Sequence, residues 1–372
     1  MIRPLLSLAA WFVAATLWCL PAAAQVRLTD VAGRSVTLPA KVERILLGEG
    51  RLLPAYGVFE RDDVARRLVG MMGEFEVLDA AGYAQWRARF PQLDKVPRVG
   101  RQSSGSFSDE QAIALRPQVA IFGMAGGHGP SQSDRETLAR LEAAGVAIVF
   151  VDFRHDPLKN TPRSMEVLGT VLGKRAEADA FVAEWRAQLA RVTSRLAGVT
   201  APTVFLENRV GLSDDCCATM VGLVGLLLDA AGGANVARGL IPGEHGTLNL
   251  EYLLAKQPRH YVGTGIGSMA TAQASPLRIV LGADATPEAA RASLVRATQR
   301  RGIAQLEAVQ QGRAFAVWHH FYNSPFNVAA LQAMAKRLHP DLFADLDPGS
   351  TLQAFYTRFQ PVPLTGVYWV GL

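Results

Sequence analysis

The sequence is poor in cysteine, in lysine and in long apolar runs, and each shortage excludes a class of protein. Three cysteines occur in 372 residues. Two of them, Cys216 and Cys217, are neighbours whose pairing closes no useful loop, which excludes a disulfide scaffold. After the N-terminal segment, no apolar stretch approaches the ~20 residues of a membrane-spanning helix. Arginine far outnumbers lysine and alternates with acids, which favours dispersed surface charge over a nucleic-acid-binding surface.

The composition is that of a folded globular protein. Hydrophobic residues make up 49% of the chain and charged residues 19%, so the chain is not intrinsically disordered. Its 34 glycines and 20 prolines follow no period, which excludes a collagen-like protein. The length suits roughly two domains of ~150 residues.

Residues 1–24 read as a cleaved signal peptide. Arg3 precedes an apolar run from Leu5 to Leu20, and Ala22–Ala24 form a small-residue cleavage site. Cys19 follows the bulky Trp18, which argues against a lipid anchor. We therefore expect cleavage after Ala24 and an exported protein whose formal charge falls from +5 to about +4 with the loss of Arg3.

From residue 26 to 159 the chain alternates short apolar runs with helical stretches. Buried strands are expected over 44–47, 119–122 and 146–153, and helices over 109–115 and 134–144. Strands separated by such helices are typical of parallel βαβ units. This region is predicted to form an N-terminal α/β lobe.

Residues 160–198 are predicted to form linking helices. Thr161-Pro162 favours a helix start, and Gly169 and Gly173 are expected to break that first helix. A continuous amphipathic pattern then predicts one long helix over 175–196, about 33 Å in length. From 199 to 372 the α/β alternation resumes as a C-terminal lobe. Its strands are expected over 203–206, 260–262 and 314–318, and its helices over 221–231, 293–300, 303–310 and 327–337.

This order of elements resembles the helical-backbone periplasmic binding proteins of ABC importers, which capture ferric siderophores, cobalamin or haem. The matching blocks include the hairpin at 31–34, the run from Glu110 to Phe122, "LEAAGV" at 141–146, "LDAAGGANV" at 228–236 and "LEYLLAKQPRHY" at 250–261. The resemblance implies an α/β fold of two Rossmann-like lobes bridged by a single long α-helix. It further implies a monomer in the periplasm without a resident cofactor, which delivers its ligand to an ABC permease in the inner membrane.

The chain departs from this family at the acidic residues that usually dock against permease arginines. Relatives carry one such acid on each lobe. After the Gly-Gly pair of the second lobe this chain has Ala234, and the only nearby substitutes are Glu49 and Glu244. Docking by the usual acid pair is therefore in question.

Ligands of parallel α/β sheets lie beyond the carboxyl ends of the strands, which points to a set of loops independently of the resemblance. The candidate ligand-binding residues in those loops are Arg51, Arg101, Phe107, Arg154, Arg209, Trp318, His319 and Tyr322. Guanidinium groups fit carboxylate or catecholate oxygens, and aromatic rings cover the apolar body of a ligand. Their combination favours a bulky anionic ligand.

The preferred ligand is a ferric siderophore, and cobalamin or haem is the alternative. Five of the seven histidines fall in these loops, so whether a histidine or tyrosine contacts a metal is left open. Cys216-Cys217 is read as a vicinal disulfide or a rigid loop rather than a metal site. The sequence contains no G-x-S-x-G, Walker or H-E-x-x-H motif, so an enzyme is not expected. A secreted enzyme is the least favoured alternative.

Overall fold

The computed structural model describes residues 25–125, 127–212 and 216–372. The predicted signal peptide lies outside the described residues. The described part begins with a hairpin of β1 (Gln25–Thr29) and β2 (Ser35–Pro39), which pair antiparallel. No helix among the described residues has the length and apolar character needed to cross a membrane.

The first sheet contains four parallel strands in the order β4-β3-β5-β6. They are β3 (Ile45–Leu47), β4 (Leu68–Met71), β5 (Val119–Gly123) and β6 (Ala147–Val151). The predicted strands near 45, 119 and 147 are confirmed, whereas β4 was not anticipated. The helices of this region are η1 (Gly50–Leu52), α1 (Leu53–Tyr56), α2 (Glu74–Leu78), α3 (Ala80–Arg89), η2 (Pro91–Lys95), η3 (Ser104–Ser106), α4 (Asp109–Ala114) and α5 (Arg135–Ala143).

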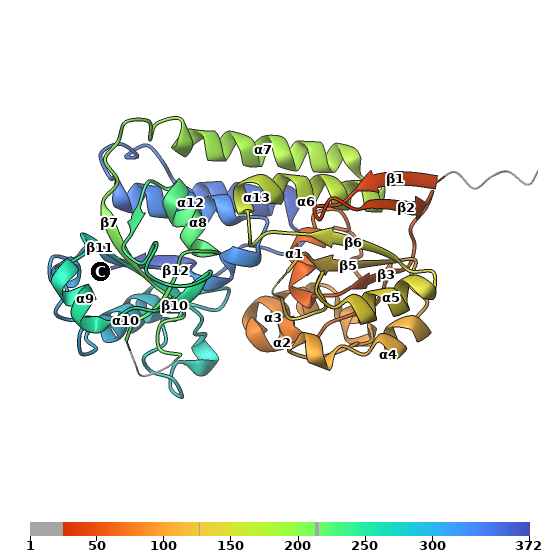
Figure 1. Ribbon diagram of the computed structural model, residues 1–372, viewed down its shortest axis with the longest axis horizontal. Helices are drawn as coiled ribbons and strands as arrows, with labels where there is room; N and C mark the ends of the chain where they lie inside the picture. Colours follow the sequence, from red (N-terminus) through yellow and green to blue (C-terminus); the bar gives the residue numbers. More distant parts are fainter. Residues whose placement is uncertain (1–24, 126, 213–215) are drawn as a thin grey trace, which may run out of the picture.

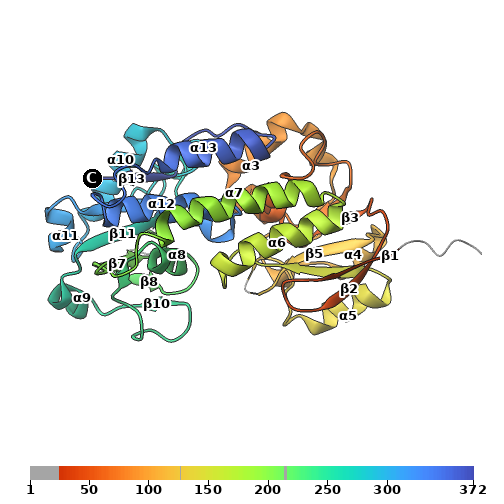
Figure 2. The ribbon, with the colours of Figure 1, turned by 90° about the horizontal axis from the view of Figure 1, so that it is seen from above.

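Two long helices follow, and the second one spans both halves of the molecule (Figures 1 and 2). α6 runs over Pro157–Leu172, so it begins five residues before the predicted Pro162, which lies inside it. Pro157 instead occupies the first turn, where its missing N–H costs nothing. Gly173 ends α6 with a left-handed φ of 68°. α7 (Arg175–Thr193) confirms the predicted bridging helix, three residues shorter than expected.

The second sheet has seven strands with mixed directions. β7 (Thr203–Glu207), β11 (His260–Gly265) and β12 (Ala314–Trp318) form its parallel centre. Around them lie β8 (Ala218–Met220), β9 (Ala234–Asn235), β10 (His245–Thr247) and β13 (Trp369–Gly371). Its helices are α8 (Val224–Ala230), α9 (Leu250–Lys256), η4 (Met269–Thr271), α10 (Pro287–Thr298), α11 (Glu307–Gln310), η5 (His319–Asn323), α12 (Asn327–Leu338) and α13 (Pro348–Phe359). The α/β class and the two-lobe architecture are confirmed.

An aromatic cluster fastens the bridging helix to the last part of the chain. Phe181 of α7 packs against the rings of Phe326, Phe355 and Phe359, with centroids 5.1–5.9 Å away. These residues belong to one buried core with the strands of the first sheet. Helix α13, from the end of the chain, thus packs beside α7 and α12 (Figure 2).

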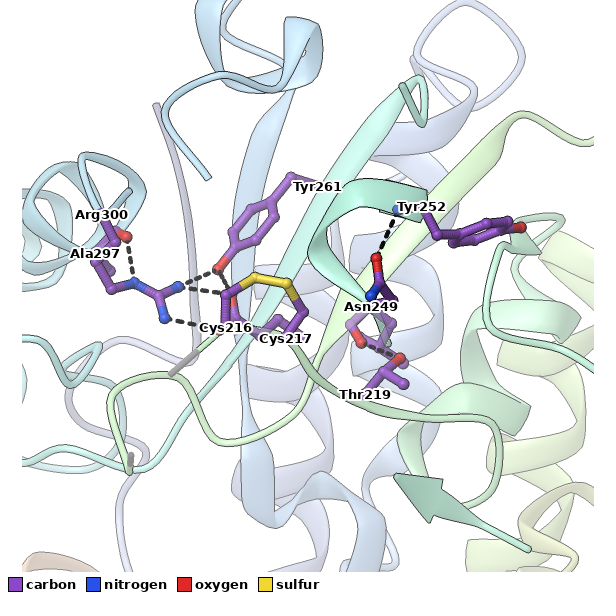
Figure 3. The surroundings of a disulfide bond; sticks show 10 residues. Cys216, Cys217, Thr219, Asn249, Tyr252, Tyr261, Ala297 and Arg300 are labelled. Carbon is purple, nitrogen blue, oxygen red and sulfur yellow. Dashed lines mark hydrogen bonds and ion pairs between the residues drawn. A yellow bond between two sulfur atoms is a disulfide. The ribbon is translucent and has the colours of Figure 1, made fainter. Parts of the chain in front are cut away.

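Cys216 and Cys217, which immediately precede β8 in the chain, form a disulfide (Figure 3). Beside it, Tyr261 donates to Glu207 Oε2 over 2.5 Å, and Arg300 binds the same carboxylate through both terminal nitrogens at 2.8 and 2.6 Å. Burial raises the pKa of Tyr261, so the phenol stays protonated as a donor. The polar groups buried beside the disulfide therefore satisfy one another.

Candidate ligand-binding cleft

A cavity of about 400 Å³ lies between the two sheets. Its walls come from both halves of the chain, at the carboxyl ends of β3, β7, β11 and β12. This is the place where parallel α/β sheets bind ligands. The lining residues that carry charge, aromatic rings or imidazoles are Arg51, Asp79, His128, Arg209, Arg278, Asp284, Trp318, His319, His320 and Tyr322.

Arg51 is the most deeply placed cation of this cleft. It follows β3, is 5% exposed, and donates from Nη1 to Tyr322 Oη at 2.8 Å and to His320 Nδ1 at 3.1 Å. Its Nε lies 4.0 Å from the buried carboxylate of Glu74. Among the described residues, neither Nε nor Nη2 has a hydrogen-bond partner. Burying such donors without acceptors is costly, so an acceptor supplied by a ligand would stabilise this arginine.

Tyr322 lies between two guanidinium groups. Arg51 and Arg154 stand 5.3 and 5.4 Å from the centre of its ring, within the range of a cation–π interaction. Arg154 itself lies beneath the cleft, where both of its terminal nitrogens bind the carboxylate of Glu49. A Cβ on Gly127 would meet Glu49 Oε1 at 1.9 Å, so the glycine lets the loop close over this ion pair.

The second half of the chain supplies two more cations. Arg209 follows β7 with a left-handed φ of 48°, and Thr264 Oγ1 accepts its backbone N–H over 2.7 Å. A non-glycine residue in this region is conformationally costly and is often found at functional sites. Arg278 lines the same wall, and its buried Nε has no hydrogen-bond partner in the described part of the chain.

The cleft carries an excess of positive charge. Its three arginines face two carboxyl groups, Asp79 and Asp284. Burial raises the pKa of Asp79 to about 6, so this carboxyl group loses its negative charge only as the pH falls below about 6. The arrangement therefore favours an anionic ligand.

Three histidines line the cleft, and their imidazoles are held neutral. Burial and the nearby Arg209 and Arg51 lower the pKa of His319 to about 3. The pKa of His320 is also lowered by burial and by Arg51, and its Nε2 lies 3.1 Å from Leu78 O across the cleft. Burial and Arg51 likewise lower the pKa of His128. Neutral imidazoles can bind metal or donate one hydrogen bond each.

Of the eight residues predicted from the sequence, five line this cavity: Arg51, Arg209, Trp318, His319 and Tyr322. Arg101 is exposed and lies outside it, where its backbone N–H donates to Ser106 Oγ. Phe107 packs edge-on against Phe122, with ring centroids 5.8 Å apart, in the core behind the first sheet. Arg154 supports Tyr322 from below.

Sequence reasoning missed two segments of the wall. Val77–Ala80 join α2 to α3, and Arg278–Asp284 follow the loop after β11. Neither segment directly follows a strand that the sequence pattern had indicated. Asp79 does carry a local signal, because its side chain accepts the backbone N–H of Gly82 and caps α3.

The suggested docking role of Glu49 is wrong. Its side chain is 1% exposed and engaged with Arg154, so it is not available to a partner. Glu244 is 41% exposed and lies 2.7 Å from His155 Nδ1, an interaction that joins the two halves of the chain.

The chain belongs to the periplasmic binding protein family, since the model of that family matches residues 76–317. Members of this family are solute-binding proteins rather than enzymes. They bind a small molecule in the periplasm and work with an ABC permease in the membrane.

Several solved structures are similar to this chain. FepB of Veillonella parvula, a TroA-like periplasmic binding protein, is 25% identical with a TM-score of 0.83, over 93% of this chain and 99% of its own. MolA of Haemophilus influenzae, solved with molybdate, is 19% identical with a TM-score of 0.65, over 92% and 99%. A periplasmic haem-binding protein of Pseudomonas aeruginosa is 22% identical with a TM-score of 0.54, over 81% and 94%. No curated protein matches the sequence significantly.

Proposed function

We propose that this protein captures an anionic iron chelate, a ferric siderophore, in the cleft and delivers it to an inner-membrane ABC permease. Arg51 carries the proposal. It is a buried cation that lines a cavity of about 400 Å³, and its Nε and Nη2 have no hydrogen-bond partner among the described residues. Carboxylate or catecholate oxygens would complete its hydrogen bonds.

The other residues of the cleft would contact different parts of the chelate. Arg209 and Arg278 stand on the second wall, so a chelate with several anionic edges would bridge the two halves of the protein. Trp318 and the ring of Tyr322 give the chelate apolar surfaces to pack against. Val77 and Leu212, each 47% exposed, lie at the rim on opposite walls and would cover its periphery.

Haem is the second candidate, because of His319. Its neutral imidazole lines the cleft beside the arginines, and within the described ranges only Nδ1 is hydrogen-bonded, 3.2 Å from Thr264 Oγ1. Haem propionates would bind the arginines, while Nε2 is the nitrogen available to an iron ligand position. Cobalamin is less well suited, since it needs no arginine cluster.

Tryptophan fluorescence tests the proposed function. The mature protein is titrated with a ferric tris-catecholate, with ferric citrate and with haem, and quenching through Trp318 is followed. We expect Arg209→Gln combined with Arg278→Gln to weaken binding of the preferred ferric chelate at least tenfold, about 1.4 kcal/mol. Arg101→Gln is the matched control, since Arg101 is an exposed arginine outside the cavity, and it should change the affinity less than twofold. Equal loss in both variants, or no quenching by either iron chelate, would contradict the proposal.

A further inference from the structure

A second concave surface lies at the other end of the second sheet. It has a volume of about 610 Å³, which is within the range of small-molecule sites. It is formed where β11 and β12 begin, whereas the cleft lies where they end. The six residues of β11 separate the two sites by about 20 Å. We call this surface the basic groove; its polar lining consists of Arg259, His260, Arg313, Lys336, Arg337 and Asp347.

Four cations of the basic groove have no counter-ion within the part of the chain that the structure describes. None of Arg259, Arg313, Lys336 and Arg337 takes part in an ion pair there. Most other arginines whose side chains interact do so with a carboxylate, as Arg195 does with Asp345.

Neutral partners hold two of these cations in place. Arg313 Nε donates to the backbone oxygen of Arg259 over 2.7 Å, and Lys336 Nζ donates to the backbone oxygens of Ala344 and Leu346. These contacts fix positions without cancelling charge.

The one carboxylate of the basic groove is engaged elsewhere. Asp347 caps the N-terminus of α13, where it accepts from the N–H groups of Gly349 and Ser350 and from the Ser350 hydroxyl over 2.6–3.2 Å. His260 also lines the groove and is only 6% exposed. Burial, together with Arg259 and Arg313, lowers its pKa to about 4, so the imidazole adds no charge near neutral pH. The lining of the basic groove thus carries four cationic side chains and one carboxylate, a net positive charge.

The floor of the basic groove is apolar. Phe315, Leu338 and Trp369 line it between the cations. At one side Arg337 lies over the backbone of Gly371, where a Cβ would come within 2.6–2.7 Å of its guanidinium atoms. The glycine therefore makes room for this cation at the rim.

We propose that the basic groove is a second ligand site, for a small soluble anion that carries two or more carboxylate or phosphate groups. Unpaired cations around a concavity bind such anions through charge-assisted hydrogen bonds, and an aromatic floor accommodates their carbon skeleton. The site is independent of the cleft and of its proposed ligand.

Calorimetric titration of the mature protein tests this site, with citrate and inorganic pyrophosphate as carboxylate and phosphate probes and with sodium chloride at matched ionic strength. We expect saturable binding of at least one probe. Arg259→Gln combined with Arg337→Gln should weaken it at least tenfold, because both side chains lie at the groove and bind no carboxylate in the described structure. Arg301→Gln, an exposed arginine of the same sheet region outside the groove, is the matched control and should have no effect.

The cleft variant R209Q/R278Q separates this proposal from the proposed function, since it should keep probe binding at the basic groove. The second site would be overturned by no saturable heat with either probe, by equal weakening in R301Q, or by loss of binding in the cleft variant alone. An equal response to sodium chloride would show only ionic screening and would also overturn it.

Discussion

Arg51 carries a full charge in a place where burial is costly, and its neighbours show how the cost is offset. The carboxylate of Glu74 lies 4.0 Å away, and Tyr322 and His320 accept from Nη1. Burial and the like charge of Glu49 raise the pKa of Glu74. These contacts fix the guanidinium before any ligand arrives, so its two remaining donors need little reorganisation to bind.

The buried histidines make stability depend on pH. The pKa of His319 is about 3 in the folded protein and 6.5 ordinarily, so between these values the unfolded chain binds more protons. Stability is therefore lost as the pH falls from 6.5 toward 3. For His319 alone we expect acidification from pH 7 to 5 to lower the free energy of unfolding by about 2 kcal/mol.

Urea unfolding of the parent chain and of His319→Asn at the two pH values measures this effect. The variant should lose less stability on acidification than the parent, while His260 and His320, which remain, keep part of the pH dependence. Asp79, whose pKa is raised to about 6, contributes in the opposite direction in both proteins and cancels from the comparison. Identical pH dependence in the two proteins would contradict the buried, neutral state of His319.

The residues that could be predicted from the sequence are those that follow a recognisable strand. Trp318 ends β12, and His319 and Tyr322 follow it. Arg51 and Arg209 follow β3 and β7, so the rule for parallel sheets was sufficient to place all five. The rule does not say in which direction a side chain points after its strand. Arg154 accordingly lies below the cleft, paired with Glu49. The rule did not identify Asp284 and Arg278, because they reach the cleft from a long irregular segment.

Among the elements, the short η5 helix joins the two halves across the cleft. His320 of η5 reaches Arg51 and the backbone oxygen of Leu78, and Tyr322 accepts from Arg51. The bridging helix α7 adds a second connection, where Trp185 Nε1 donates to Asn327 Oδ1 of α12 over 3.0 Å. Such contacts join residues far apart in the chain and leave no local pattern in the sequence.

We predict that Trp185→Phe lowers the free energy of unfolding by about 1–3 kcal/mol, because it leaves the buried Asn327 Oδ1 without its donor. Urea unfolding at neutral pH measures the loss. Asn327 Nδ2 also donates to Thr161 Oγ1. The control is therefore the triple variant W185F/N327L/T161V, since removing every member of this polar group should cost less than leaving one unpaired. If W185F were as stable as the parent chain, the bond would contribute nothing to holding α7 on α12.

For the whole molecule, the alternation of strands and helices was enough to predict two α/β lobes and a bridging helix. It could not show that α13 packs against Phe181 and the buried core of the first sheet. The pattern of an amphipathic helix shows that one face is buried but not which surface covers it. With α6, α7, α12 and α13 packed across both halves, large hinge motion is disfavoured (Figure 2).

Solution scattering checks this rigidity. We expect the radius of gyration of the mature protein to change by about 1 Å or less when a saturating ferric chelate is added. The protein mixed with molybdate, an anion other than the proposed ligand, serves as the reference. A decrease of several ångströms would show a hinge that the packed helices should prevent.

Native mass spectrometry of the protein purified from the periplasm tests the central claim most directly. We predict a fraction that carries an iron-containing anionic chelate in the parent chain and in R101Q, and its absence from R209Q/R278Q. Haem or a corrinoid in place of a ferric siderophore, or an iron chelate retained at the parent level by R209Q/R278Q, would contradict the assignment of this cleft.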